Sequence, residues 1–465
     1  MSDHQPTELL YPLDARPGAV ESAFAAIQHV LASFVGIITP TLIVGGVLGL
    51  GEHIPYLISM ALMVSGVATF IQARRPAGVG AGMICVQGTS FAFLSSVLAA
   101  GFIAKGQGGG PEEILSLIFG VCFLGAFVEI FLSQFLHKLK RVITPLVTGI
   151  VITIIGVSLI KVGMTDLAGG FKAPDFGAPG NLALGSLVLL TIIVLNRSSN
   201  SWIRLSSIVL GLALGCIVAA FMGKISFDNL AALPTFSLPV PFKYGFSFDW
   251  AAFLPIALIY LITAIESTGD ITANCIVSRQ PIKGDGYIQR IKGGVLADGF
   301  NSLLAATFNS MPNTTFSQNN GVIQLTGVAS RYIGYYIAAT LFILGMFPII
   351  GGVLQNIPKP VLGGATLVMF GTVAAAGIKI LATEHLDRRK MLIMAVAFGM
   401  GLGAMMVPDV LSQAPKLVQS IFGSAITTGG LAAIVLSILL PEETAASTNT
   451  SNEEPSELKA DPVAS

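Results

Sequence analysis

The stretch that decides the fold is Asn313-Thr314-Thr315-Phe316-Ser317-Gln318-Asn319-Asn320-Gly321-Val322-Ile323-Gln324-Leu325-Thr326-Gly327, a polar run between two apolar segments. Lipid offers no hydrogen bonds, so these side chains cannot face hydrocarbon. Four amides within the seven residues from Gln318 to Gln324 combine donors and acceptors. The run is therefore predicted to line an enclosed or water-filled cavity that suits a neutral ligand with a mixed hydrogen-bonding edge. The alternative is a polar seam between helices, which needs fewer amides.

The composition indicates a polytopic membrane protein. Of 465 residues, 53% are hydrophobic and 11% are charged, whereas soluble domains carry about 25% charged residues. The 25 basic and 25 acidic residues balance, and no basic patch with interleaved aromatics predicts nucleic-acid binding. The four cysteines match no metal motif and are predicted to be small packing residues, so neither metal nor cofactor is expected.

Apolar runs of helix-spanning length predict fourteen membrane segments in an all-α fold. They cover residues 24–48, 56–73, 80–100, 113–136, 142–163, 183–196, 205–223, 251–272, 293–308, 312–328, 333–352, 361–381, 391–410 and 417–440. The third and tenth are short and broken by polar residues, and the 293–328 region could hold two half-spans. Placing both termini in the cytoplasm puts 18 Lys and Arg residues inside and 7 outside, which together make the 25 of the chain.

A faint repeat relates the two halves of the chain. Thr89-Ser90-Phe91 resembles Thr314-Thr315-Phe316 with an offset of 225 residues. Gly36-x-Ile38-Thr39 resembles Gly269-x-Ile271-Thr272 with an offset of 233. Two halves of seven segments each must lie in opposite orientations, which is the inverted-repeat plan of secondary transporters.

Ionisable residues inside apolar segments are candidates for function. Glu266 and Asp270 are four residues apart, so they share a helix face, and two enclosed carboxylates resist ionising together. One of them is expected to carry a proton part of the time, unless Glu266 is simply paired with a neighbour. Asp298, between glycines, could instead accept backbone amides of a broken span. His29 and Glu129 are better explained as buried structural residues.

The third segment carries a second polar break, Gln87-Gly88-Thr89-Ser90, followed by Phe91. In an inverted repeat this break faces its partner in the tenth segment near the membrane midplane. Phe91 and Phe316 would then flank one cavity suited to a flat, hydrogen-bonding heterocycle. The alternative for both rings is ordinary packing, since the chain has 28 phenylalanines.

At these residues the chain resembles the nucleobase–ascorbate transporter family. Its signature is Gln, Glu or Pro, then Asn, any residue, Gly, four residues, Thr, and Arg, Lys or Gly. Gln318-Asn319-Asn320-Gly321 followed by Thr326-Gly327 satisfies every position. The resemblance extends over residues 8–440 and is strongest to bacterial xanthine permeases. Further matching stretches are Leu9-Leu10-Tyr11-Pro12-Leu13-Asp14-Ala15-Arg16-Pro17, Arg141-Val142-Ile143-Thr144-Pro145 and Gly293-Gly294-Val295-Leu296-Ala297-Asp298-Gly299.

The resemblance implies a core domain and a gate domain, a homodimer, and an elevator-like motion. The core domain would comprise residues 23–136 (segments 1–4) and 251–352 (segments 8–11), and the gate domain residues 137–250 (segments 5–7) and 353–440 (segments 12–14). Cytoplasmic tails would comprise residues 1–22 and 441–465, the latter disordered because it is polar.

The resemblance also implies roles for individual residues. Glu266 and Gln318 would bind a purine, supported by Asn319. Asp270 and Asp298 would serve ion coupling or site architecture, and His29 would affect affinity. Phe91 and Phe316 would stack on the ligand, with backbone near Ser317 and Phe91 reaching it. Ser90 departs from the pattern, because some xanthine-specific members carry Asn there, and a hydroxyl residue leaves urate open.

These inferences predict proton-coupled uptake of xanthine across a bacterial cytoplasmic membrane, with a urate or broader purine symporter as the alternative. An anion exchanger of related fold needs positive charge or an open helix end at its site, yet residues 81–93 and 309–328 contain no Lys or Arg. A membrane-embedded enzyme is not expected, because Glu266 and Asp270 lie on one helix and form no facing dyad.

Overall fold

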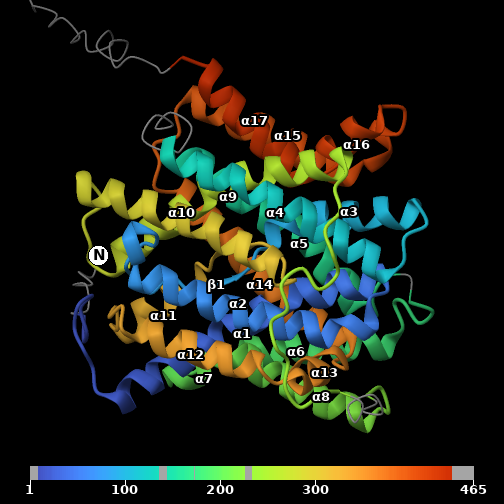
Figure 1. The fold of residues 1–465 in the computed structure, drawn as a ribbon, viewed down its shortest axis with the longest axis horizontal. Helices are drawn as coiled ribbons and strands as arrows, with labels where there is room; N and C mark the ends of the chain where they lie inside the picture. The colour runs from blue at the N-terminus through green and yellow to red at the C-terminus, as the bar shows by residue number, and fades with distance from the viewer. Residues whose placement is uncertain (1–8, 136–143, 172, 226–232, 442–465) are drawn as a thin grey trace, which may run out of the picture.

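The computed structural model describes residues 9–135, 144–171, 173–225 and 233–441. The predictions for residues 1–8 and 442–465, and the Arg141-Val142-Ile143 part of the resemblance, lie outside these ranges. The described chain is mostly helical, and its long helices lie nearly parallel across the view of Figure 1.

The helices and strands follow the predicted apolar segments closely. The first half contains α1 (Ala19–Leu48), α2 (Ile54–Arg74), β1 (Gln87–Thr89), α3 (Leu94–Gly106), α4 (Pro111–Phe135), α5 (Pro145–Leu167), α6 (Pro179–Asn196), α7 (Ser201–Leu205) and α8 (Ser207–Phe221). The second half contains α9 (Trp250–Val277), α10 (Asp285–Thr307), β2 (Asn313–Thr315), α11 (Gln318–Thr326), α12 (Ile333–Gly345), α13 (Pro348–Gln355), α14 (Lys359–Leu381), α15 (Arg388–Met406), α16 (Lys416–Phe422) and α17 (Ala425–Leu439).

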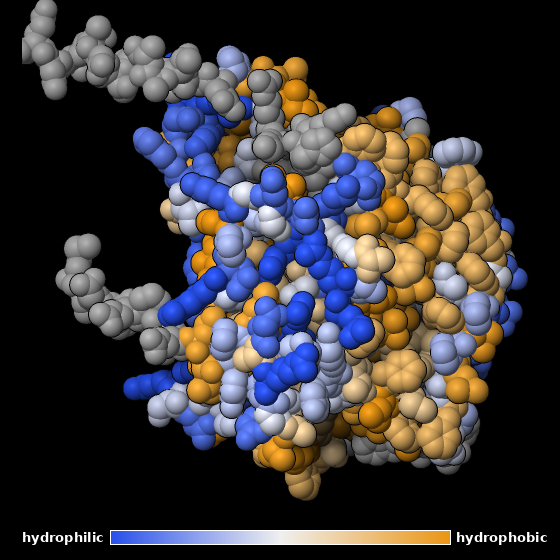
Figure 2. Space-filling model, turned by 60° about the vertical axis from the view of Figure 1, so that its left-hand side comes forward, coloured by the Kyte–Doolittle hydropathy of each residue, from blue (hydrophilic) through white to orange (hydrophobic). Residues whose placement is uncertain are grey.

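Within the described ranges, eight helices are long and apolar enough to cross a membrane, and a ninth span results if α12 and α13, bent by 75°, cross as one. Each of the fourteen predicted segments overlaps at least one helix or strand, but several of these elements are short. Figure 2 shows hydrophilic residues gathered on one face, beside a broad apolar flank. The chain is thus a multi-pass membrane protein, without a confirmed count of fourteen spans.

The prediction of a purely α-helical fold is wrong in one place. β1 and β2 pair antiparallel, with Gln87 opposite Thr315 and Thr89 opposite Asn313. Each strand precedes a short helix, so the third and tenth segments are broken as predicted, and the pairing satisfies the backbone that each break exposes. The 293–308 segment is not a half-span, because it belongs to the continuous helix α10.

The packing of the helices reflects the repeat. α5 packs along α14, α4 along α10, and α2 along α12. In the predicted repeat, α2 of the first half corresponds to α10 of the second, and α4 corresponds to α12. The α4–α10 and α2–α12 contacts are therefore equivalent under the repeat. Small residues allow close approach: a Cβ on Gly156 of α5 would lie 2.2 Å from the backbone N of Ala374 on α14.

An N-terminal strap, residues 9–16, packs against the end of α11. The backbone N–H of Tyr11 donates to Gly327 O (3.2 Å), and that of Ala329 donates to Tyr11 O (2.8 Å). Gly327 has a φ of 68° and caps α11. Leu13 is 8% exposed and belongs to an apolar cluster with Met83 and Ile271. Residues predicted to lie in the N-terminal tail therefore hold the half-helix that carries the signature.

Replacing Leu13 by alanine is expected to destabilise the protein by about 2–4 kcal/mol, because the change leaves a cavity beside Met83. Leu10, which is 66% exposed in the same strap, offers a matched control. Leu10→Ala should leave the thermal midpoint in detergent unchanged while Leu13→Ala lowers it. Equal midpoints for the two variants would show that the strap does not stabilise the fold.

Candidate functional site

The two polar breaks lie side by side in the interior. Besides the β1–β2 pairing, the backbone N–H of Ser90 donates to Pro312 O (2.8 Å), and that of Phe316 donates to Val86 O (2.9 Å). Ser90 is buried, and its hydroxyl has no hydrogen-bond partner within the described ranges. The predicted repeat partners therefore face each other, and Ser90 and Phe316 lie at the same crossing.

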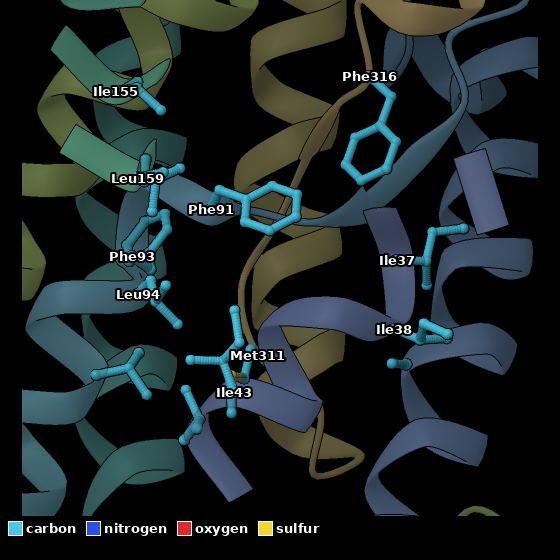
Figure 3. Packing of buried hydrophobic residues seen from close by; sticks show 14 of the residues in the cluster. Ile37, Ile38, Ile43, Phe91, Phe93, Leu94, Ile155, Leu159, Met311 and Phe316 are labelled. Carbon is cyan, nitrogen blue, oxygen red and sulfur yellow. The ribbon is translucent and has the colours of Figure 1, made fainter. Parts of the chain in front are cut away.

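Phe91 and Phe316 point toward one another across the packed interior (Figure 3). Phe91 packs edge-on against Phe370 of α14, with ring centroids 5.1 Å apart. The Phe316 ring lies over two glycines: a Cβ on Gly88 would be 2.5 Å from Phe316 Cζ, and one on Gly36 would be 2.7 Å from Cε2. Both rings are buried, so each has packing partners as well as a place beside the break.

Gly88→Ala is expected to displace Phe316 and lower stability by about 1–3 kcal/mol, because the new methyl overpacks the site. The methyl would also lie 2.8 Å from Ile37 Cγ1, which blocks relaxation to that side. Gly321 of α11 is exposed, and a methyl group added there would meet no atom within 4 Å. Gly321→Ala should therefore leave the thermal midpoint unchanged or raise it. A Gly88→Ala variant as stable as the wild type would contradict the proposed position of the ring.

Asp298 is the hub of a buried hydrogen-bond network. Gln72 Nε2 of α2 donates to Asp298 Oδ1 (2.6 Å), and Thr315 Oγ1 of β2 lies 3.2 and 3.1 Å from the two carboxyl oxygens. Ser267 Oγ of α9 donates to Oδ2. The donors are side chains and not backbone amides, so that alternative for Asp298 is wrong. These bonds connect α10, which carries Asp298, to α2, α9 and β2.

Sequence reasoning missed Gln72 and Asn301, two amides of the network around Asp298. Gln72 also donates to Gly294 O (3.0 Å) and accepts from the backbone N–H of Ala81 (2.9 Å). Asn301 of α10 donates to Gln87 Oε1 (3.3 Å), and Gln87 Nε2 donates to Thr315 Oγ1 (2.8 Å). Gln72 and Asn301 are amides inside apolar segments, and this feature is the signal that could have identified them.

His29 and Asn319 join α1 to α11. The Asn319 amide nitrogen lies 2.9 Å from His29 Nδ1 and donates to His29 O (3.2 Å). Both residues are buried, and His29 Nε2 and Asn319 Oδ1 have no partner in the part of the chain that the structure describes. Asn320 Nδ2 in turn donates to the backbone O of Asp270 (3.2 Å). Asn319 and Asn320 thus connect α11 to its neighbouring helices.

The structure places the four amides of this run in different surroundings. Asn319 and Asn320 form the polar seam that was the alternative, and Gln324 is exposed. Gln318 is half-buried, and its amide forms no hydrogen bond among the described residues. The tertiary structure singles out Gln318 because α11 turns its two neighbours into the packing.

Glu266 is half-buried, whereas the other two candidate carboxyl residues, Asp270 and Asp298, are buried. Glu266 lies on α9 next to Ser267, which bonds the Asp298 hub, and its Oε2 has no hydrogen-bond partner within the described ranges. Asp270 is buried one turn further along. Ser317, at the start of α11, is also half-buried. Glu266, Ser317 and Gln318 thus present hydrogen-bonding groups that the protein itself does not fully enclose.

Three cavities lie away from these residues. One of about 280 Å³ between α1, α8 and α13 is lined almost wholly by apolar side chains. Another of about 520 Å³ lies between α1, α3, α5 and α14. A third of about 280 Å³ adjoins the second at Gly46 and Lys359. None of the three contains a candidate site residue. No cluster of metal-ligating residues is found within the described ranges.

A pair of broken helices that cross in the interior, beside polar groups without a partner among the described residues, is typical of membrane transporters. A family model described as a permease family matches residues 20–410. The chain belongs to this family, the nucleobase–ascorbate transporters that its signature indicated.

Curated relatives match the chain over nearly its whole length. It is 46% identical to the xanthine permease XanP of Escherichia coli over 444 residues, which cover 94% of this chain and 96% of the relative. It is 46% identical to XanQ of the same organism over 447 residues, covering 95% and 96%. A xanthine permease of Bacillus subtilis is 35% identical over 428 residues, covering 91% and 94%.

Solved structures share the fold at low sequence identity. The transmembrane domain of the cyanobacterial bicarbonate transporter BicA matches with a TM-score of 0.53 and 13% identity, covering 90% of this chain and 96% of that one. SLC26A9 matches with a TM-score of 0.61 and 13% identity, covering 89% and 64%. These likenesses concern the fold alone.

Proposed function

We propose that the protein imports xanthine together with protons across the cytoplasmic membrane. The observation that carries this function is the pair Glu266 and Gln318, half-buried and incompletely bonded beside the β1–β2 crossing. The 46% identity to two xanthine permeases supports the choice of substrate.

The chemistry of the pair fits an oxo-purine. An amide carries both donors and an acceptor, so Gln318 would form paired bonds with the six-membered ring as another base would. A carboxylate only accepts, so Glu266 would take ring N–H groups. Phe91 and Phe316 would enclose the flat faces, with backbone near Ser317 completing the site. Asp298, Asn319 and His29 would hold this arrangement, and Asp270 would assist coupling beside Glu266.

The motion would follow the predicted domains. Residues 23–136 and 251–352 would form the core that carries the site, and residues 137–250 and 353–440 the gate, in a homodimer with both termini in the cytoplasm. The contact of Phe91 with Phe370 would lie at the boundary between core and gate. An elevator movement would open this boundary first to one side and then to the other.

Uptake of labelled xanthine tests the function directly. Cells or proteoliposomes containing the protein should accumulate unchanged xanthine, and unlabelled xanthine should compete more strongly than pyrimidines. A protonophore should abolish accumulation, while a sodium gradient should not drive it. Sodium-driven uptake that survives the protonophore would contradict proton coupling, and uptake only of inorganic anions would favour an exchanger.

A urate transporter is the second candidate, favoured by the small, buried hydroxyl of Ser90, which has no partner among the residues that the structure describes. Xanthine and urate differ by one oxo group on the five-membered ring, and serine leaves room for that oxygen and can donate to it. Ser90→Asn should therefore weaken urate binding relative to xanthine by about 1–3 kcal/mol, as one lost contact does. The measurement is urate inhibition of labelled xanthine uptake in both proteins. An unchanged ratio of affinities in an active variant would place Ser90 away from that ring.

A further inference from the structure

The cavity of about 520 Å³ between α1, α3, α5 and α14 carries charges that the proposed function does not use. It lies beside the C-terminal ends of α1, α3 and α5 and the first residue of α14. Its wall includes Lys105 of α3, Asp166 of α5 and Lys359 of α14. Two ammonium groups and one carboxyl thus face one space, on the side that the charge distribution predicts to be outside.

The carboxyl of Asp166 lacks a full set of partners. The residue is 6% exposed, and its Oδ2 has no hydrogen-bond partner in the described part of the chain. The ion pairs of the described residues join other side chains, so neither Lys105 nor Lys359 is paired with Asp166. A buried carboxyl oxygen without a partner is costly unless a ligand or water completes it.

The backbone positions the Lys359 ammonium in this space. A Cβ on Gly46 of α1 would lie 3.0 Å from Lys359 Nζ, and one on Gly170 would lie 3.1 Å from Lys359 Cγ. The lysine therefore extends through a gap that two glycines leave open, and reaches from α14 across to α1. Lys105 Nζ is anchored by the backbone O of Leu48 (3.4 Å) at the end of α1.

We propose that this cavity is an outer binding site that receives the oxo-purine before it reaches Glu266 and Gln318. Lysine ammonium groups donate to carbonyl oxygens, and the Asp166 carboxyl accepts a ring N–H, so the three groups match the alternating edge of such a ring. A net positive wall also attracts the weakly acidic oxo-purines. This inference rests on the proposed function.

The position of the cavity suits a transient site. α1 and α3 belong to the predicted core, and α5 and α14 to the predicted gate, so the walls separate if the two domains move. The site would then lose its ligand as the core carries substrate inward. Its contribution would be to the capture of substrate at low concentration, and not to the maximal rate.

The test is the initial rate of labelled xanthine uptake by the full-length protein at matched membrane levels. Lys359→Gln should raise KM about ten- to a hundredfold, as expected for the loss of one charge-assisted hydrogen bond, with Vmax within about twofold. Lys359→Arg should restore KM, because it keeps the charge. Lys161→Gln, which removes an exposed lysine at the same end of α5, should behave as the wild type.

Asp166→Asn separates ligand binding from charge balance. If the Asp166 carboxyl accepts a hydrogen bond from the ligand, Asp166→Asn should raise KM. If the carboxyl only balances the charge of the lysines, KM stays the same or falls, and this result would remove Asp166 from the ligand contacts. Equal KM values for Lys359→Gln and wild type would overturn the outer site. So would an equal rise in Lys161→Gln, because surface charge in general would then be the cause. A wild-type protein that takes up no xanthine would instead contradict the proposed function.

Discussion

Replacing Glu266 by glutamine is expected to reduce xanthine accumulation by about a hundredfold or more while the protein stays folded in the membrane. The side chain keeps its size, but an amide donates a hydrogen where the carboxylate accepts one. Each hydrogen-bonding group left unpaired in an enclosed site costs about 1–3 kcal/mol. The amide also cannot take up a proton, so both binding and coupling would be lost.

The half-buried position of Glu266 makes the substitution a test of the site and not of the fold. Its Oε2 has no partner among the described residues, so little packing depends on the charge. Glu113 of α4 offers a control, since it is an exposed carboxyl in the first turn of that helix. Glu113→Gln should retain uptake within about threefold, because removing a charge from an exposed first turn costs only about 0.3–1 kcal/mol. Normal kinetics in Glu266→Gln, or equal loss in both variants, would remove Glu266 from the site.

Asp298→Asn is expected to abolish uptake through the structure of the site. Three donors, from Gln72, Ser267 and Thr315, face the two carboxyl oxygens. An amide places its own donor against at least one of them. Hydrogen bonds to charged groups contribute about 1.5–3 kcal/mol each, so we expect a loss of stability above about 3 kcal/mol and a lower thermal midpoint in detergent.

The control for this substitution is Asp285→Asn in the same helix. Asp285 is exposed in the first turn of α10, where removing a charge costs about 0.3–1 kcal/mol. It should leave both the midpoint and uptake close to those of the wild type. An Asp298→Asn protein with unchanged stability but no uptake would assign Asp298 to coupling instead of architecture.

The sequence by itself determined the class of protein and the plan of the fold. Long apolar runs are costly to expose to water and polar runs are costly to expose to lipid, so the spans and the breaks in the third and tenth segments were predictable. The repeat of Thr89-Ser90-Phe91 and Thr314-Thr315-Phe316 predicted that these breaks face each other, and β1 pairs with β2. The signature from Gln318 to Gly327 identified the family, because it requires particular residue types at several positions and this chain matches each of them.

Only the tertiary structure decided which polar side chains remain available. Asp298 and Gln72 are 226 residues apart, and Asn319 and His29 are 290 apart, and no local pattern encodes such pairings. Neighbouring amides in α11 point in different directions, so Asn319 and Asn320 are used in packing while Gln318 is left half-buried. The pairing of β1 with β2 also depends on contacts between residues far apart in the sequence. A broken span must satisfy its backbone wherever another break happens to lie, and packing of the whole chain sets that place.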